Sequence, residues 1–198
     1  MIHFNWRRQL TVAFAFICLS SCEVMSDLEL NLEPAPEAVT YLIPQGQHYA
    51  TSNFYKKTTS SKLRFEVLFD SSAVYTTTDA ANQGDINKLY GLSDCGGLHQ
   101  VNSARFGWRW YQNKLEIHAY TYLNKQRQSK LIGTVALGKK SVCELEFLDQ
   151  EYQFWLDGKM VKMPRACNGE GAGYQLYPYF GGDETAPHDV TIYIRDLE

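Results

Sequence analysis

The feature that most limits how this chain can fold is a series of short segments in which apolar and polar side chains alternate. In KLRFEVLF, for example, Leu63, Phe65 and Val67 fall on one face of an extended strand and charged residues fall on the other. No stretch shows the sustained period of an amphipathic helix. Such strands are expected at residues 62–69, 103–111, 114–123, 130–137, 141–148, 151–157, 159–164, 174–180 and 189–197. The series predicts an all-β chain folded as an antiparallel β-sandwich rather than an α/β protein.

The segment FWLDGKMV contains a hairpin signal at Asp157 and Gly158. An Asp-Gly pair between alternating segments is typical of a type I′ turn, because both central residues must adopt positive φ. This turn would place Phe154 opposite Val161. A strand that ends in an aromatic residue, an apolar residue and Asp-Gly resembles those of concanavalin-like and laminin-G-like jelly rolls. The resemblance implies two curved sheets whose concave face often holds sugars.

A second hairpin is expected where segments 103–111 and 114–123 meet, because only two residues separate them. A two-residue turn sets Trp108 opposite Ile117 on one face. That face is apolar, so the tryptophans of NSARFGWRW are expected in the core, where burial of their large apolar area is favourable. The other face is polar and becomes the candidate binding surface.

The candidate binding surface combines hydrogen-bond donors, acceptors and flat aromatic rings, which suit the hydroxyls and apolar ring faces of sugars. The later segment YQLYPYFGGDETAPHD adds alternating tyrosines beside a Gly-Gly turn. The predicted ligand-binding residues are Arg105, Arg109, Glu116, His118, Tyr120, Tyr122, Tyr177 and Tyr179. Two alternatives stay open: an ordinary solvated outer face, and a tyrosine-rich loop that only closes the sandwich.

Two classes of carbohydrate enzyme make different demands on this surface. A glycoside hydrolase needs two carboxylates across the scissile bond, and the nearest match to the Glu-x-Asp-x-Glu strand of concanavalin-like glucanases is a short Glu-Leu-Glu, so hydrolysis is disfavoured. A polysaccharide lyase needs a cation to neutralise a uronate carboxylate, and a base and an acid. EIHAY and YPYFGG resemble the Gln-Ile-His strand and the late tyrosine-rich strand of jelly-roll alginate lyases. For a lyase, this resemblance implies catalytic roles for His118 and Tyr179, and the residue types that β-elimination needs add Arg105 and Tyr120 as candidates.

The segments GLHQVNSARFGWRW and YPYFGGDETAPHD together resemble uncharacterised exported proteins and lipoproteins of Bacteroidetes-type bacteria. Several of those proteins belong to polysaccharide-handling systems, so the resemblance implies a polysaccharide or glycoconjugate as the partner. The expected function is carbohydrate binding on an Arg/Tyr/His face. The alternatives are a lyase that cleaves a uronate glycan by β-elimination, and a non-catalytic structural surface protein.

The amino-terminal region carries Arg7 and Arg8 before the apolar run LTVAFAFICL and the sequence SSC. This layout is typical of a secretory signal and is too short to span a bilayer as a stable helix. Leu-Ser-Ser-Cys resembles the bacterial lipobox, which implies a signal peptide over residues 1–21 and a lipid bilayer anchor on acylated Cys22. Because Glu23 follows instead of aspartate, an outer-membrane lipoprotein is expected, on the periplasmic or the cell-surface side. A plain cleaved signal with an incidental cysteine is the alternative.

Residues 22–38 are acidic and contain two prolines, so they are expected to form a flexible tether before one β-sandwich domain at residues 39–198. Cys95 and Cys167 occupy turn-like sequences, whereas Cys143 shares the parity of apolar strand residues. This favours a disulfide between Cys95 and Cys167 and a buried thiol at Cys143, with other pairings open.

The formal net charge of −3 and the pI near 6.0 give no basic surface for nucleic acid, which is therefore not an expected partner. The sequence contains no phosphate loop, zinc spacing or nucleophile motif, so no cofactor is expected. A structural calcium ion is one interpretation of Asp183, Glu184 and Asp189, which put hard oxygen ligands in one loop. A solvated acidic loop is the alternative.

Overall fold

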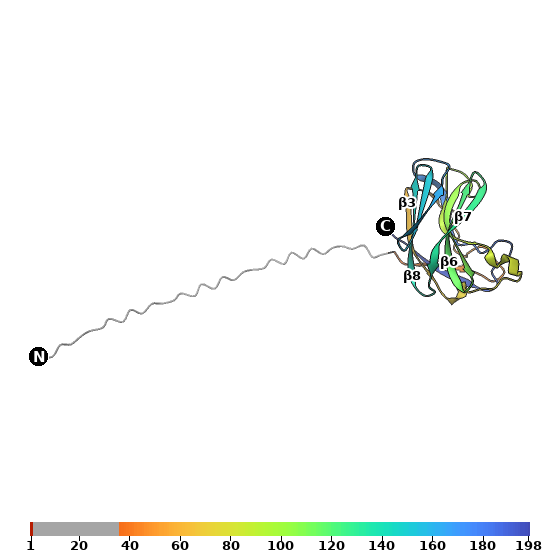
Figure 1. Cartoon of the computed structure of the whole chain (residues 1–198), viewed down its shortest axis with the longest axis horizontal. Helices are drawn as coiled ribbons and strands as arrows, with labels where there is room; N and C mark the ends of the chain where they lie inside the picture. The colour runs from red at the N-terminus through yellow and green to blue at the C-terminus, as the bar shows by residue number, and fades with distance from the viewer. Residues whose placement is uncertain (2–35) are drawn as a thin grey trace. The chain divides into compact units, whose positions relative to one another are not determined.

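The computed structural model describes Met1 and residues 36–198. Nearly all of the predicted signal peptide, the predicted acylation site at Cys22 and most of the predicted tether therefore lie outside the described residues. Residues 36–198 form two six-stranded antiparallel sheets (Figure 1). The predicted all-β class and β-sandwich architecture are confirmed. Neither short helical turn within residues 36–198 has the length and apolar character needed to cross a membrane.

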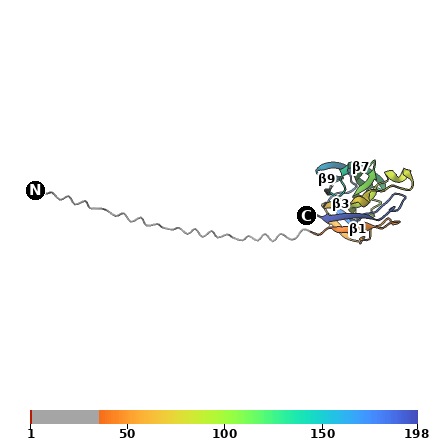
Figure 2. The same cartoon turned by 90° about the horizontal axis from the view of Figure 1, so that it is seen from below.

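Both sheets join strands that are distant in the sequence, and Figure 2 shows the first and last strands of the domain side by side. The first sheet has the order β1 (Val39–Ile43), β12 (Val190–Asp196), β3 (Lys62–Phe69), β8 (Lys140–Leu148), β9 (Glu151–Leu156), β10 (Lys159–Pro164). The second has the order β2 (Lys57–Ser60), β11 (Gly171–Leu176), β4 (Asn87–Ser93), β5 (Ser103–Tyr111), β6 (Lys114–Leu123), β7 (Gln126–Val135). Two 3-10 turns separate β3 from β4, namely η1 (Ser71–Ala73) and η2 (Ala80–Gly84).

The Asp-Gly hairpin forms between β9 and β10 with the predicted register. Phe154 pairs with Val161. The turn residues Asp157 and Gly158 have φ of 46° and 83°, as a type I′ turn requires.

The hairpin of β5 and β6 also has the predicted register, and it fixes which side chains face the core. Trp108 pairs with Ile117, and both are 0% exposed. Arg109 pairs with Glu116 on the opposite face. Burial of the apolar face contributes roughly 25 cal/mol for each Å² of apolar surface removed from water. The core therefore holds this sheet in place and leaves the polar face of β5 and β6 on the outside.

A disulfide and a buried ion pair together fasten the carboxyl end of β4 to the segment before β11. Cys95 and Cys167 form the predicted disulfide, and Cys143 is a free buried thiol, as expected. Next to the disulfide, Arg165 Nε lies 2.7 Å from Asp94 Oδ2, and both side chains are 0% exposed. Burial opposes ionisation of Asp94, but hydrogen bonds from Arg165 and from a buried tyrosine outweigh it and lower the pKa of this carboxyl.

The sequence prediction missed three strands, β1, β2 and β4, and extended the strand at residues 174–180 too far. In β4 the alternation is broken by a register shift between Lys88 and Gly91, and most of its side chains are buried. Strand β11 ends at Leu176. Pro178 follows, and it has no backbone N–H to donate to a ladder.

Candidate functional site

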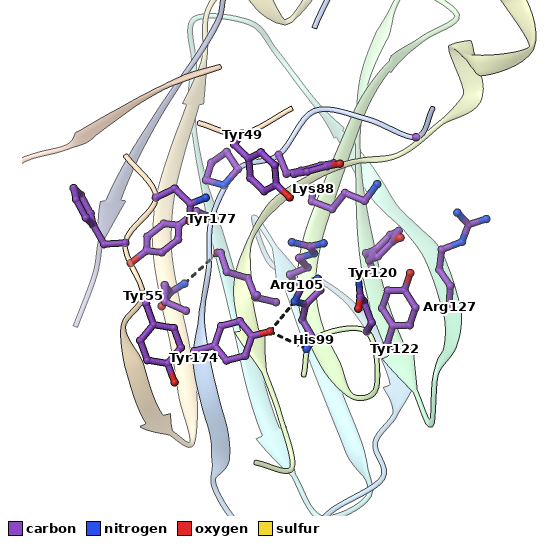
Figure 3. Close-up of a pocket in the computed structure, with 18 residues that line it drawn as sticks. Tyr49, Tyr55, Lys88, His99, Arg105, Tyr120, Tyr122, Arg127, Tyr174 and Tyr177 are labelled. Atoms are coloured by element: carbon purple, nitrogen blue, oxygen red, sulfur yellow. Dashed lines mark hydrogen bonds between the residues drawn. The ribbon is translucent and has the colours of Figure 1, made fainter. Parts of the chain in front are cut away.

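A groove with a cavity volume of about 620 Å³ lies on the polar face of the second sheet (Figure 3). Strands β4, β5, β6 and β11 supply its base, and the segments around residues 49–55 and 177–182 supply its edges. Among the described residues that line it, none is acidic, and seven are tyrosines. The lining residues are Tyr49, Asn53, Phe54, Tyr55, Lys88, His99, Gln100, Arg105, Tyr120, Tyr122, Arg127, Tyr174, Gln175, Leu176, Tyr177, Pro178, Tyr179 and Gly182.

Arg105 is the most buried cation of the groove, with 8% of its surface exposed. Its Nε is buried without a hydrogen-bond partner, and no ion pair within residues 36–198 includes Arg105. The guanidinium carbon lies 5.7 Å from the centre of the Tyr120 ring, at cation–π distance. Burial lowers the pKa of Arg105 to about 10. The side chain is therefore still charged at neutral pH, in a place where its charge is poorly compensated.

Lys88 brings a second cation into the groove. Its ammonium group donates to the carbonyl of Gly181 and lies 5.5 Å from the ring centres of both Tyr120 and Tyr179. Burial, followed by the like charge of Arg105, lowers the pKa of Lys88 to about 8, although Asp85 acts in the opposite direction. Lys88 is therefore mostly protonated at pH 7 and about half neutral at pH 8, so it loses its proton much more readily than an ordinary lysine.

Two neighbouring tyrosines of β6 lie beside these cations. The ring centres of Tyr120 and Tyr122 are 6.0 Å apart. Burial, and then the neighbouring Tyr122, raise the pKa of Tyr120 to about 12. The Tyr120 phenol is therefore a proton donor at neutral pH, and it lies within cation–π distance of both Lys88 and Arg105.

The approach to Lys88 depends on a glycine. A Cβ atom at Gly182 would overlap the Asp85 carboxylate, so with any larger residue either the Asp85 side chain or the loop that carries the Gly181 carbonyl would have to shift. Asn87 holds the same loop, because its Oδ1 accepts the Gly181 N–H at 2.7 Å. The Lys88 amine is thus positioned by the backbone of a tightly packed turn.

A separate polar cluster lies farther along β5 and β6, and its members do not line the groove. Arg109 Nε lies 2.7 Å from Glu116 Oε2, and His118 Nε2 lies 3.0 Å from the same oxygen. Burial opposes ionisation of Glu116, but hydrogen bonds from Arg109 and His118 outweigh it and lower its pKa. Burial also lowers the pKa of His118. Arg109 and His118 therefore both have Glu116 as a hydrogen-bond partner, and the charge of Glu116 is compensated within the cluster.

The structure thus divides the predicted ligand-binding residues between two places. Five of them line the groove, namely Arg105, Tyr120, Tyr122, Tyr177 and Tyr179. The other three, Arg109, Glu116 and His118, form the neighbouring cluster. Of the residues suggested for a lyase, His118 is the one outside the groove.

Sequence reasoning missed several lining residues, chiefly Lys88, His99 and Tyr174. Lys88 lies in a strand without clean alternation, and His99 lies in the loop between β4 and β5. Tyr174 was placed on a strand, but nothing in its sequence ties it to the β5 surface, because β11 reaches that surface only through β4. The density of tyrosines in the sequence was the one signal that could have indicated that more residues line this groove.

Two of the three acidic residues suggested for calcium, Glu184 and Asp189, accept backbone N–H groups from different segments. Glu184 accepts the backbone N–H groups of Thr78 and Asp79, both at 2.8 Å, and Asp189 accepts that of Gln45 at 2.8 Å. Within residues 36–198, the potential metal ligands that lie close together are Asp94 and the two disulfide cysteines. The loop acids are therefore not gathered around one point.

No protein-family model and no curated protein matches the sequence. Solved structures do match. The chain is similar to alginate lyase vAL-1 from Chlorella virus, with 12% identity, 80% of this chain and 82% of that protein covered, and a TM-score of 0.50. It is also similar to alginate lyase AlyC3, with 13% identity, 81% and 74% covered, and a TM-score of 0.53. The fold is a jelly roll. The chain is also similar to the laminarinase catalytic domain from Thermotoga maritima, with 10% identity, 80% of this chain and 76% of that protein covered, and a TM-score of 0.49.

Proposed function

We propose that the groove binds a uronate-containing polysaccharide. Arg105 is the observation that carries the proposal. A buried guanidinium without a counter-ion is unfavourable in the free protein, and a carboxylate supplied by a ligand would form the charge-assisted hydrogen bonds that it lacks.

The rest of the lining fits such a ligand. Arg105, Lys88 and Arg127 give the groove a positive potential, and no acidic residue lines the described part of it. The tyrosines offer hydroxyl groups and apolar ring faces, which suit a sugar chain. The two neighbours with TM-scores of 0.50 and 0.53 are named as alginate lyases, and alginate is a uronate polysaccharide.

A second candidate function is cleavage of the bound chain by β-elimination, and Lys88 is the observation that favours it. An amine with a pKa of about 8 is a suitable general base near neutral pH. The absence of carboxylates among the lining residues disfavours hydrolysis by the usual pair of acids.

In this reaction Arg105 would neutralise the uronate carboxylate and so make the adjacent C–H more acidic. The Lys88 amine would take that proton, and the electron pair of the C–H bond would form a carbon–carbon double bond as the glycosidic carbon–oxygen bond breaks. The Tyr120 phenol would give its proton to the leaving oxygen. The products are a new chain end with a hydroxyl group and an unsaturated uronate.

Binding and cleavage can be tested on the same protein. Titration calorimetry with alginate, polygalacturonate and a neutral glucan should show binding of at least one uronate polymer and no binding of the glucan. The Arg105→Met variant should lose that binding. Retained binding in this variant would contradict the proposed role of the groove. Ultraviolet absorbance of the unsaturated product separates the two functions, because a flat trace with every bound polymer leaves a binding protein and rejects the lyase.

We further propose that the protein is an outer-membrane lipoprotein anchored through Cys22. The support is the sequence Leu-Ser-Ser-Cys after a signal-like apolar run, with Glu23 next. Labelling with a radioactive fatty acid should mark the wild-type protein and not the Cys22→Ala variant. A label that survives the substitution would refute the anchor.

A further inference from the structure

The groove contains a hydrogen-bonded pair, His99 and Tyr174, whose chemistry differs from that of the cations. In Figure 3, Arg105 lies between Lys88 and this pair. The Tyr174 hydroxyl oxygen lies 3.0 Å from the backbone nitrogen of His99 and 2.7 Å from its ring Nδ1. Strand β11 brings Tyr174 there because it pairs with β4, whose end leads into the loop that carries His99.

The two hydrogen bonds hold the histidine ring in one orientation. The backbone N–H of His99 donates to the Tyr174 oxygen, and the Tyr174 hydroxyl shares a second hydrogen bond with ring Nδ1. Burial, followed by the charge of Arg105, lowers the pKa of His99, which favours the neutral ring. No hydrogen bond to His99 Nε2 is present within residues 36–198, so this nitrogen is available to a ligand, as a donor when it carries the ring proton.

Exposed aromatic rings stand beside this donor. Tyr55 is 80% exposed, and its ring centre lies 5.6 Å from that of Tyr174 with an angle of 35° between the rings. Phe54, which also lines the groove, is 71% exposed. Large apolar side chains that line a groove while so exposed are typical of surfaces that bind a ligand. Neutral donors and apolar ring faces suit the hydroxyls and the ring face of a sugar rather than its carboxylate.

We infer that His99, Tyr174 and Tyr55 form a second sugar subsite beside the carboxylate site at Arg105. Tyr55 and Tyr174 would pack against the ring face of the neighbouring sugar residue, and His99 Nε2–H would donate to one of its hydroxyls. This inference rests on the proposed function and deepens it. It states that the protein recognises a stretch of polymer, so that affinity increases with the number of sugar residues.

The test measures the binding of the monosaccharide mannuronate and of the alginate hexasaccharide to the full-length chain by titration calorimetry. The wild type should bind the hexasaccharide more tightly than the monosaccharide. Tyr55→Ala and His99→Ala should each weaken hexasaccharide binding by about three- to tenfold, the effect of one aromatic contact or one hydrogen bond. Binding of the monosaccharide, which Arg105 holds, should change by less than about twofold in either variant, since a single sugar residue does not reach the second subsite. Tyr193→Ala, on the outer face of the first sheet, is the matched control and should change neither affinity.

The outcomes distinguish this inference from the proposed function. If Arg105→Met abolishes binding while Tyr55→Ala and His99→Ala leave the hexasaccharide affinity unchanged, the groove is a uronate site and the second subsite is overturned. If the wild type binds neither mannuronate nor the hexasaccharide, and no other uronate oligomer, the proposed function and the subsite are both overturned. An equal loss for the two chain lengths in Tyr55→Ala would also overturn the subsite, because it would place Tyr55 at the carboxylate site.

Discussion

The two buried arginines of this jelly roll have opposite surroundings. Arg165 is fully buried, forms an ion pair with Asp94 and donates to the backbone carbonyls of residues 148, 169 and 170. Arg105 is 8% exposed, and no ion pair within residues 36–198 includes it. The charge of Arg165 therefore has an ion-pair partner and hydrogen-bond acceptors, whereas Arg105 has no counter-ion among the described residues and its Nε has no hydrogen-bond partner.

The difference separates a structural role from a binding role. A buried charge whose partners are all present is strongly destabilising only when one of those partners is removed. A buried charge without partners lowers the stability of the free protein and is retained where a ligand completes it. Arg165 therefore belongs to the scaffold beside the disulfide, and Arg105 belongs to the site. Four substitutions test this division, in order of decreasing effect on the free energy of unfolding.

Arg165→Met should lower the free energy of unfolding by about 3–5 kcal/mol, because Asp94 would remain buried and charged without its partner. Urea denaturation with the disulfide intact measures the change. The double variant Asp94→Leu/Arg165→Met should recover part of the loss. A cost below about 1 kcal/mol would show that Arg165 is no more important to the scaffold than a surface ion.

Arg105→Met should have the opposite sign and raise the free energy of unfolding by about 1–2 kcal/mol, since it removes a poorly compensated buried charge. The same variant should bind uronate oligosaccharides at least about tenfold more weakly, a loss of about 1.4 kcal/mol or more. Urea denaturation measures the free energy of unfolding and titration calorimetry measures the binding, both on one preparation of the variant. A loss of stability similar to that of Arg165→Met would remove the distinction between the two arginines.

Lys88 should make stability depend on pH. Its pKa is about 8 in the folded protein and has an ordinary value of 10.5, so between these values the unfolded chain binds one more proton and stability rises with pH. After allowance for partial solvent screening, the rise should be on the order of 1 kcal/mol relative to Lys88→Met. Unfolding curves of both proteins at several pH values measure it. Parallel pH profiles for the two proteins would rule out the lowered pKa and, with it, Lys88 as the base.

Lys62→Met should have the smallest effect. Lys62 contacts both Glu144 and Glu146, at 2.9 and 3.0 Å, but it lies on the outer face of the first sheet and 44% of its side chain is exposed. Exposed pairs contribute about 0–1 kcal/mol. Urea denaturation should detect little change in the free energy of unfolding, and titration calorimetry should detect no change in the binding of uronate oligosaccharides. A larger loss would mean that paired surface charges matter here as much as the buried pair.

The part of the site that was predictable is the part that lies on one hairpin. The register of β5 and β6 follows from a two-residue turn, and it places Arg105 and Tyr120 as neighbours on the polar face. The same register could not tell Arg105 from Arg109, because both alternate outward. Arg109 finds Glu116 on the next strand, whereas Arg105 faces tyrosines.

The sequence by itself determined the strands with clear alternation, the registers of two hairpins, the apolar faces and the preferred disulfide. These are local properties, because alternation has a period of two and a tight turn fixes its own geometry. Only the tertiary structure decided that β11 and β4 lie beside β5, and so that Lys88, His99 and Tyr174 meet Arg105 in one groove. Burial of Arg105 is the sum of contacts from segments far apart in the chain, and no local pattern records such a sum.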